Sequence, residues 1–251
     1  MKFFAHRGGT ARGLENTLAA FALAIADECD GFECDVRLTA DAEPVIIHDR
    51  NLRRLAGANV EIARVSLTEL RHFRLANGES VPHLDDVMDL VGRASVECFI
   101  ELKETSDVLV RRVVASIRRW RVEDRTWIMA FARRAQALRV AKTLHAGVRT
   151  NVITPVPTNL VRAARMANAD AVSFGYSSLP GSYRFFRLID TCVDLTRRVE
   201  QARTAGLHVS CGIANDAPDI RRMAAYGVDG LWTDDVPRAR ALVRCESVSP
   251  P

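Results

Sequence analysis

Eight short runs rich in apolar, β-branched or aromatic residues alternate along this chain with longer amphipathic stretches. The runs span residues 2–6, 31–38, 96–103, 125–131, 148–153, 169–174, 207–212 and 228–233. Short strands separated by helical segments are typical of a parallel sheet with right-handed crossovers, and eight such units close into a barrel. The sequence therefore predicts an α/β fold of the TIM (β/α)₈ type.

The length of 251 residues suits one such barrel. We expect a single domain over residues 1–245 and a frayed C-terminal tail over residues 246–251. Turn signals after His48 predict an elaborated connection following the second run. Residues 175–192 form a second long connection, rich in aromatic residues, and two interpretations stay open for it: a lid or binding loop, or a short helix packed on the barrel.

The composition is that of an ordinary folded protein, with 48% hydrophobic and 26% charged residues. No stretch reaches the roughly 20 apolar residues of a transmembrane helix, and the first residues lack the apolar segment of a signal peptide. The six cysteines form no CxxC pair and mostly lie in apolar runs, which favours buried reduced thiols. We therefore expect a cytoplasmic protein without stable membrane association.

Arginine makes up all but three of the 35 basic residues. Arginines concentrated between residues 111 and 134 suggest a nucleic-acid patch as one interpretation. A solvated helical face explains them better, because charged residues at helical spacing ordinarily face water. We therefore expect no nucleic-acid partner.

Charged residues lie on one side of two predicted strands. Side chains of a barrel strand alternate between the interior and the helical layer, so Glu33 shares a side with Asp35, and Glu101 with Lys103. Buried charges of this kind must be paired or must bind a metal. Three carboxylates around one lysine leave an excess of negative charge that a divalent cation would balance. Oxygen ligands favour Mg²⁺ or Ca²⁺, with Mn²⁺ also suitable.

Two histidines follow the first two predicted strands, and both should reach the same mouth of the barrel. A pair such as His6 and His48 can accept a proton from a nucleophile and donate one to a leaving oxygen. Arg7 and Lys103 would neutralise the nonbridging oxygens of a phosphate. These parts together indicate a small-molecule phosphodiester as the substrate.

The chain resembles the glycerophosphodiester phosphodiesterase family from about Phe4 to Pro237. The resemblance rests on motifs near strand ends: His6-Arg7-Gly8, Glu15-Asn16-Thr17, Gly31-Phe32-Glu33-Cys34-Asp35-Val36, Asp41, His48-Asp49, Pro82-His83-Leu84, Glu101-Leu102-Lys103 and Gly227-Val228-Asp229-Gly230-Leu231-Trp232-Thr233-Asp234.

The resemblance implies a TIM barrel that hydrolyses a glycerophosphodiester to glycerol 3-phosphate and an alcohol. It implies a divalent cation held by Glu33, Asp35 and Glu101, and an acid/base pair formed by His6 and His48. Three further residues match the motifs and are expected to support the site: Glu15 as a partner of Arg7, Asn16 as a helix cap, and Asp49.

The sequence departs from the family on the presumed substrate side. Gly212 stands where family members often carry tryptophan, and Ala130 where serine is frequent. The missing indole predicts an open wall that tolerates a bulkier alcohol. Phe131, Phe174, Tyr176 and Gly212 are the residues expected to line this pocket.

Two alternatives remain at the level of sequence. One is a phospholipase D-like enzyme that acts on lysophospholipids, with residues 175–192 accommodating an acyl chain. The other is a non-catalytic barrel that binds partners through its arginine-rich helices. The sequence leaves open the alcohol released, the metal used, the acid and base roles of the histidines, a cyclic-phosphate route as against direct hydrolysis, and the oligomeric state.

Overall fold

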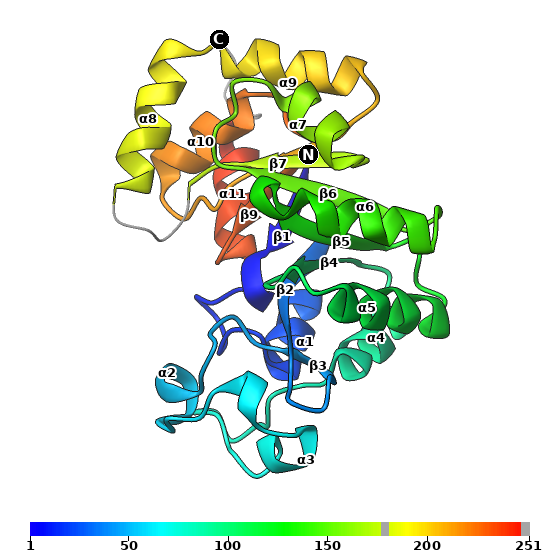
Figure 1. Cartoon of the computed structure of the whole chain (residues 1–251). Helices are drawn as coiled ribbons and strands as arrows, with labels where there is room; N and C mark the ends of the chain where they lie inside the picture. The colour runs from blue at the N-terminus through cyan, green and yellow to red at the C-terminus, as the bar shows by residue number, and fades with distance from the viewer. Residues whose placement is uncertain (177–180, 247–251) are drawn as a thin grey trace.

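Eight parallel strands close into a ring in the computed structural model, which describes residues 1–176 and 181–246. The ring runs β1–β2–β4–β5–β6–β7–β8–β9, and β9 pairs with β1 to complete it (Figure 1). The strands of the ring are β1 (Lys2–Ala5), β2 (Gly31–Leu38), β4 (Glu97–Leu102), β5 (Thr126–Phe131), β6 (Arg149–Thr154), β7 (Ala171–Phe174), β8 (His208–Cys211) and β9 (Gly230–Thr233). The TIM barrel expected from the alternating runs is confirmed.

One further strand, β3 (Pro44–Ile46), was not expected from the sequence. It pairs antiparallel with the end of β2, with Val36 opposite Ile46. Three residues that begin with a proline lack the length and the alternation that identify a strand, because proline cannot donate a backbone hydrogen bond.

The helices lie outside the ring (Figure 1). They are α1 (Leu18–Ala26), α2 (Arg53–Ala56), α3 (Leu67–Leu70), α4 (Leu84–Arg93), α5 (Asp107–Trp120), α6 (Ala135–Leu144), α7 (Leu160–Ala167), α8 (Ser182–Cys192), α9 (Leu195–Thr204), α10 (Ala217–Ala225) and α11 (Val236–Glu246), with 3₁₀ turns η1 (His6–Gly8), η2 (Ile62–Arg64) and η3 (Ala132–Arg134). On α5 the arginines at positions 111, 112, 118 and 119 are exposed, as expected for a solvated face.

The connection after β2 is elaborated, as the turn signals predicted. It carries β3, α2, η2 and α3, and the part with α2 and α3 projects from the barrel (Figure 1). Leu52, Leu55, Ile62 and Leu70 form a small apolar cluster of its own. This satellite core fixes the segment that follows His48, and so holds the histidine over the mouth of the barrel.

Strand side chains divide between the interior and the helical layer with the predicted alternation. Inside the ring, Phe4 packs against Phe99 and Trp232, with ring centroids 4.8 and 4.7 Å apart. Cys34 and Ile100 lie instead in the core between strands and helices. This aromatic cluster fills part of the barrel interior below the C-terminal mouth, beside the hydrogen-bonded side chains of Asn151, Ser173 and Ser210.

The long connection over residues 175–192 contains α8, which supports the interpretation as a helix packed on the barrel. Phe186 and Ile189 are buried, and the Tyr226 hydroxyl donates to Asp190 Oδ1 at 2.6 Å. Residues 177–180, part of the alternative lid, lie outside the described residues. So do residues 247–251 of the expected tail, whereas Glu246 is the last residue of α11.

The cysteines are free thiols where the structure describes them. Cys29, Cys34, Cys98 and Cys211 are buried, as expected, and Cys192 is exposed. Within the same described segments, no helix combines the length and the apolar character needed to cross a lipid bilayer.

Candidate active site

Three carboxylates meet at the C-terminal mouth of the barrel. Glu33 and Asp35 extend from β2, and Glu101 extends from β4, where it is the register partner of Asp35. One carboxylate oxygen from each lies within 4.8 Å of the others, and all three side chains are buried. Their common side of the sheet follows from the two-residue period of strands, as the sequence indicated.

Two cations flank this cluster without neutralising it. Lys103 Nζ lies 3.1 Å from Asp35 Oδ1 and 2.9 Å from Glu101 Oε1, and Arg7 Nε lies 3.3 Å from Asp35 Oδ2. Burial works to raise the pKa of Asp35, but the charges of Lys103 and Arg7 outweigh it and hold the pKa below its usual value. Asp35 is therefore ionised at neutral pH and could bind a cation.

Glu33 is less well compensated. Its Oε2 accepts the backbone N–H of Arg7 at 3.0 Å, while its buried Oε1 has no hydrogen-bond partner among the described residues. Burial, together with the charges of Asp35 and Glu101, raises the pKa of Glu33 well above its usual value. An orphaned buried oxygen beside two further carboxylates suits a hard divalent cation such as Mg²⁺, Ca²⁺ or Mn²⁺. The residues present therefore fit the expected metal.

Asn16 positions the cluster, and its expected role as a helix cap is wrong. The N-cap of α1 is Thr17, whose hydroxyl accepts from Ala20 N at 3.2 Å. Asn16 has φ 57°, which turns its side chain away from the helix and toward β2. Its Nδ2 donates to Asp35 Oδ2 at 2.8 Å, and its Oδ1 accepts from Asp35 N at 3.0 Å.

His6 lies at the end of β1, in η1, and contacts a carboxylate that sequence reasoning did not place in the site. Its Nδ1 is 2.8 Å from Asp234 Oδ1, and Asn215 Nδ2 donates to Asp234 Oδ2 at 2.6 Å. Burial works to raise the pKa of Asp234, but the hydrogen bond and charge of His6 help to outweigh it, so the pKa is lower than usual. The available signal was parity, because Asp234 follows the interior residue Trp232 by two positions.

His48, which follows β3, has a matching arrangement. Its Nδ1 is 2.9 Å from Asp49 Oδ1, and its backbone carbonyl accepts from Arg37 Nε and Nη2 at 2.9 and 2.7 Å. Burial lowers the pKa of His48. The expected supporting role of Asp49 thus has a geometric basis.

A chain of ion pairs joins the two sides of the site. Arg54 Nε lies 2.7 Å from Asp49 Oδ2, and both of its terminal nitrogens donate to Glu15 at 2.7 Å. Glu15 Oε1 is also 3.1 Å from Arg7 Nη1, so its predicted partnership with Arg7 is present. Arg54 was missed because the four-residue helix α2 carries no periodic pattern to single it out.

In both histidines Nδ1 contacts a carboxylate, and Nε2 has no hydrogen-bond partner in the part of the chain that the structure describes. A carboxylate on Nδ1 fixes the ring orientation and stabilises the imidazolium form, which leaves Nε2 to exchange protons with a bound molecule. The mouth therefore carries two oriented proton-transfer groups beside a buried oxygen-ligand site.

One of the expected pocket residues faces elsewhere. Phe174 is buried against Tyr226 of the α10 end, with ring centroids 6.1 Å apart, because its neighbour Ser173 takes the interior side of β7. The Tyr176 hydroxyl donates to Asp219 of α10 at 2.9 Å. Phe174 is therefore wrong as a pocket residue, whereas Tyr176, half-buried just after β7, stays a prediction. Phe131, half-buried at the end of β5, keeps its expected place near the mouth.

The backbone at Gly212 leaves no room for a side chain. A Cβ at this position would lie 2.5 Å from Trp232 Cβ and 2.7 Å from the Trp232 carbonyl oxygen, and the backbone has φ +154°. The close approach of Trp232 therefore requires glycine at this position, and the open wall stays a prediction.

We expect Gly212→Ala to lower the free energy of unfolding by about 2 kcal/mol or more, because the added methyl overpacks a close contact in a conformation that favours glycine. Gly92→Ala is the matched control, since its Cβ would meet no atom within 4 Å inside α4. It should stabilise by about 0.5–1 kcal/mol. Urea denaturation measures both, and equal midpoints would contradict the packing argument.

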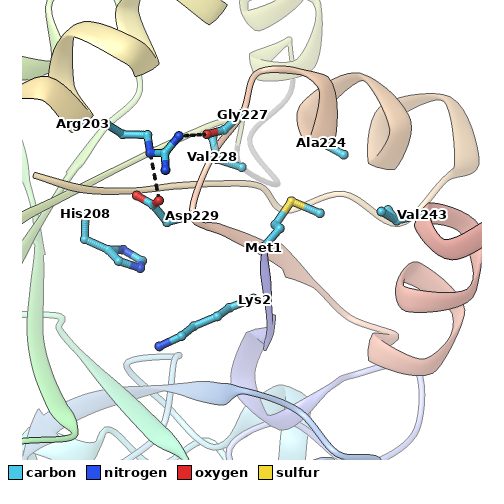
Figure 2. Close-up of a pocket in the computed structure, with 9 residues that line it drawn as sticks. All are labelled: Met1, Lys2, Arg203, His208, Ala224, Gly227, Val228, Asp229 and Val243. Carbon is cyan, nitrogen blue, oxygen red and sulfur yellow. Dashed lines mark hydrogen bonds and ion pairs between the residues drawn. The ribbon is translucent and has the colours of Figure 1, made fainter. Parts of the chain in front are cut away.

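A separate cavity of about 620 Å³ lies at the other end of the barrel, where β1 and β8 begin (Figure 2). Its charged groups have partners: Arg203 Nε is 3.0 Å from Asp229 Oδ1, and Lys2 Nζ is 2.7 Å from Glu97 Oε2. Because this cavity lies where strands β1 and β8 begin, it is separate from the carboxylates and histidines at the C-terminal mouth.

The comparison with known proteins agrees with this geometry. The model of the Glycerophosphoryl diester phosphodiesterase family matches residues 6–238. A glycerophosphodiester phosphodiesterase from Caldanaerobacter subterraneus subsp. tengcongensis is 26% identical over 252 residues, 96% of either chain. The lysophospholipase D GDPD1 of Homo sapiens is 31% identical over 138 residues, which cover 50% of this chain and 43% of that protein. An Oleispira antarctica phosphodiesterase, solved in complex with the product sn-glycerol-3-phosphate, shares the fold with a TM-score of 0.82 at 20% identity over 97% of either chain.

Proposed function

Because this chain belongs to the glycerophosphoryl diester phosphodiesterase family, we propose that it is a cation-dependent enzyme that hydrolyses glycerophosphodiesters to glycerol 3-phosphate and an alcohol. The observation that carries the proposal is the pair of histidine–carboxylate contacts beside the buried carboxylate cluster. Both histidines keep a free Nε2, which favours an enzyme over a non-catalytic binding barrel.

The substrate phosphate would lie between the cluster and the histidines. A divalent cation held by Glu33, Asp35 and Glu101 would supply charge stabilisation for the phosphoryl oxygens. Arg7 and Lys103 already border the cluster, and each can donate hydrogen bonds to nonbridging oxygens. These contacts orient the phosphorus for attack along the line between the two imidazoles.

Proton transfer falls to the histidines. One Nε2 accepts a proton from the nucleophile, and the other donates a proton to the departing alcohol oxygen. The nucleophile is either water, which gives glycerol 3-phosphate directly, or a neighbouring glycerol hydroxyl, which gives a cyclic phosphate that water then opens. Asp234 and Asp49 act as positioning residues, because each fixes the ring of its histidine and stabilises the charge that the ring acquires or holds. Each histidine has its Nδ1 held by a carboxylate and its Nε2 available for proton transfer, which suits this division of roles.

The direct test is product formation by the purified protein. Glycerophosphoglycerol is supplied with Mg²⁺, Ca²⁺ or Mn²⁺ in turn, and released glycerol 3-phosphate is measured with an enzyme-coupled assay. We expect product with at least one cation and none in excess EDTA. No product with any of several glycerophosphodiesters would overturn the proposal.

Action on lysophospholipids is a second candidate, favoured by the similarity to a protein named lysophospholipase D. Phe185 and Leu188 on α8 are 48% and 60% exposed, which gives the surface an apolar site for contact with an acyl chain. A lysophospholipid offered in place of the water-soluble diester in the same assay distinguishes the two candidates by their kcat/KM values.

Asp49→Asn should shift the pH dependence of turnover in a direction that the structure sets. Burial lowers the pKa of His48, and the Asp49 hydrogen bond works in the opposite direction, so its loss should lower that pKa further. If His48 is the general base, the acidic limb of the kcat/KM profile moves to lower pH; if it is the general acid, the alkaline limb does. Asp89→Asn on α4 is the control, and two unmoved limbs would contradict the argument.

A further inference from the structure

Four arginines border the mouth of the barrel on one side, and we call them the basic rim: Arg37, Arg50, Arg133 and Arg134. Arg37 lies near the end of β2, Arg50 lies two residues after His48, and Arg133 and Arg134 lie in η3 after β5; β4 lies between β2 and β5 in the ring (Figure 1). Arg134 Nη1 donates to the carbonyl of Leu102, the last residue of β4, at 3.3 Å. The rim therefore adjoins Glu101 and Lys103 directly.

The members of the rim act on one another electrostatically. Burial lowers the pKa of Arg37; the charges of Glu104 and Asp35 work against this, and those of Arg50 and Arg134 add to it. Burial likewise lowers the pKa of Arg134, with Arg133 and Arg50 adding to the effect. Arg133 lies over the ring of Phe131, 4.8 Å from its centroid, which fixes it beside the mouth.

Negative charge on the rim is scarce. Glu104, whose nearest oxygen is 3.9 Å from Arg37 Nη1, is the one ion-pair partner that the rim has among the described residues. Arg50 and Arg133, both exposed, have no carboxylate within ion-pair distance in residues 1–176 and 181–246. Arginines elsewhere do find partners, as Arg93 does with Asp89. The rim thus carries excess positive charge at the entrance to the site.

We propose that the basic rim recognises a second anionic group on the alcohol of the substrate. The enzyme then selects diesters whose alcohol carries an anionic group over those whose alcohol carries only a cationic one. The inference rests on the proposed function and adds to it a class of substrate. The single charge of the scissile phosphodiester is met by Arg7 and Lys103 inside the cluster. The rim lies outside them, where only a group beyond the scissile phosphate reaches, such as a carboxylate or a further phosphate.

The sharpest test uses two substrates that differ by one carboxylate, glycerophosphoserine and glycerophosphoethanolamine. At low ionic strength the wild-type kcat/KM should favour the serine diester by roughly three- to tenfold, as expected for one charge at partly solvated distances from several guanidinium groups. The ratio should fall toward one in about 0.5 M salt, because screening weakens such interactions.

Variants locate the effect. Arg50→Gln and Arg133→Gln should each reduce the serine-to-ethanolamine ratio by roughly twofold to threefold, and Arg50→Glu should reduce it more, since it reverses the charge. Arg93→Gln, an equally exposed arginine on α4, is the matched control and should leave the ratio unchanged. Melting temperatures verify that the variants fold. We expect them to be close to that of the wild type, because Arg50 and Arg133 are exposed.

The outcomes separate the two proposals. Equal kcat/KM values for both diesters, or a ratio that Arg50→Glu and Arg133→Gln leave unchanged, would overturn selection by the rim while the hydrolase function stands. Hydrolysis of neither diester, nor of glycerophosphoglycerol, would overturn the function and the rim together. A salt-sensitive preference for the serine diester that the rim variants diminish supports the inference.

Discussion

Glu33→Gln is expected to abolish turnover and, in metal-free protein, to raise the melting temperature. Burial and the charges of Asp35 and Glu101 raise the pKa of Glu33 well above its usual value. The folded state therefore holds this proton more tightly than the unfolded state. The free energy of unfolding falls as pH rises above about 4.5, the pKa in the unfolded chain, until the pKa in the folded state is passed. Glutamine removes that charge and keeps an oxygen for the backbone N–H of Arg7.

The same substitution removes a ligand, so activity and stability should move in opposite directions. We expect kcat/KM to fall by about 10³-fold or more, because the phosphoryl charge loses its compensating cation. Thermal unfolding at pH 7, in EDTA and then in Mg²⁺, Ca²⁺ or Mn²⁺, gives the second measurement. A cation should stabilise the wild type strongly and the variant weakly.

Glu97→Gln is the matched control at the other end of the barrel. Burial works to raise the pKa of Glu97, but hydrogen bonds from Lys2 and Trp127 outweigh it and lower the pKa. Its ionised form is therefore stabilising at neutral pH, and glutamine should lower the melting temperature while the response to cations stays intact. Full turnover in protein verified as metal-free, or an undiminished cation response in Glu33→Gln, would contradict the metal site.

Replacing either candidate catalytic histidine by alanine should lower kcat/KM by roughly 10²–10⁴-fold without unfolding the protein. His6 and His48 each have an Nε2 without a hydrogen-bond partner among residues 1–176 and 181–246, and neither belongs to the apolar core, so the loss should fall on proton transfer. Steady-state kinetics measures the loss. His72→Ala, at an exposed position in the elaborated connection, should leave kcat/KM unchanged.

Leaving-group chemistry assigns the two roles. The p-nitrophenyl ester of glycerol 3-phosphate releases p-nitrophenolate, which leaves without help from a general acid. This substrate should therefore rescue the variant that lacks the acid far more than the variant that lacks the base. Combined with the pH shift expected for Asp49→Asn, this identifies the role of His48 independently. Equal rescue of both alanine variants would count against separate roles.

The sequence by itself determined the barrel and the carboxylate cluster. Alternation with a period of two decides which residues share a side of a strand, and parallel strands bring their C-terminal ends to one mouth. Glu33, Asp35 and Glu101 could be assembled on that reasoning alone. The same holds for His6 and His48, which directly follow strands or short loops.

Parity was not enough where a strand is apolar on both sides. The residues of β7, Ala171–Phe174, show no alternation strong enough to reveal that Ser173 faces the interior, so Phe174 was assigned to the wrong side. Asn16 and Thr17 are both residue types that suit the N-cap before Leu18, and the sequence does not choose between them. In both cases two local arrangements agree with the sequence, and only the packing against other elements selects one.

Contacts between distant parts of the chain were decided by the tertiary structure. Asp234 reaches His6 across 228 positions, and Arg54 reaches Glu15 across 39. The Cβ and backbone of Trp232 approach Gly212 so closely that no side chain fits there. Local patterns report the side on which a residue lies, whereas closure of the ring sets which side chains meet there, because β9 and β1 become neighbours only when the barrel closes.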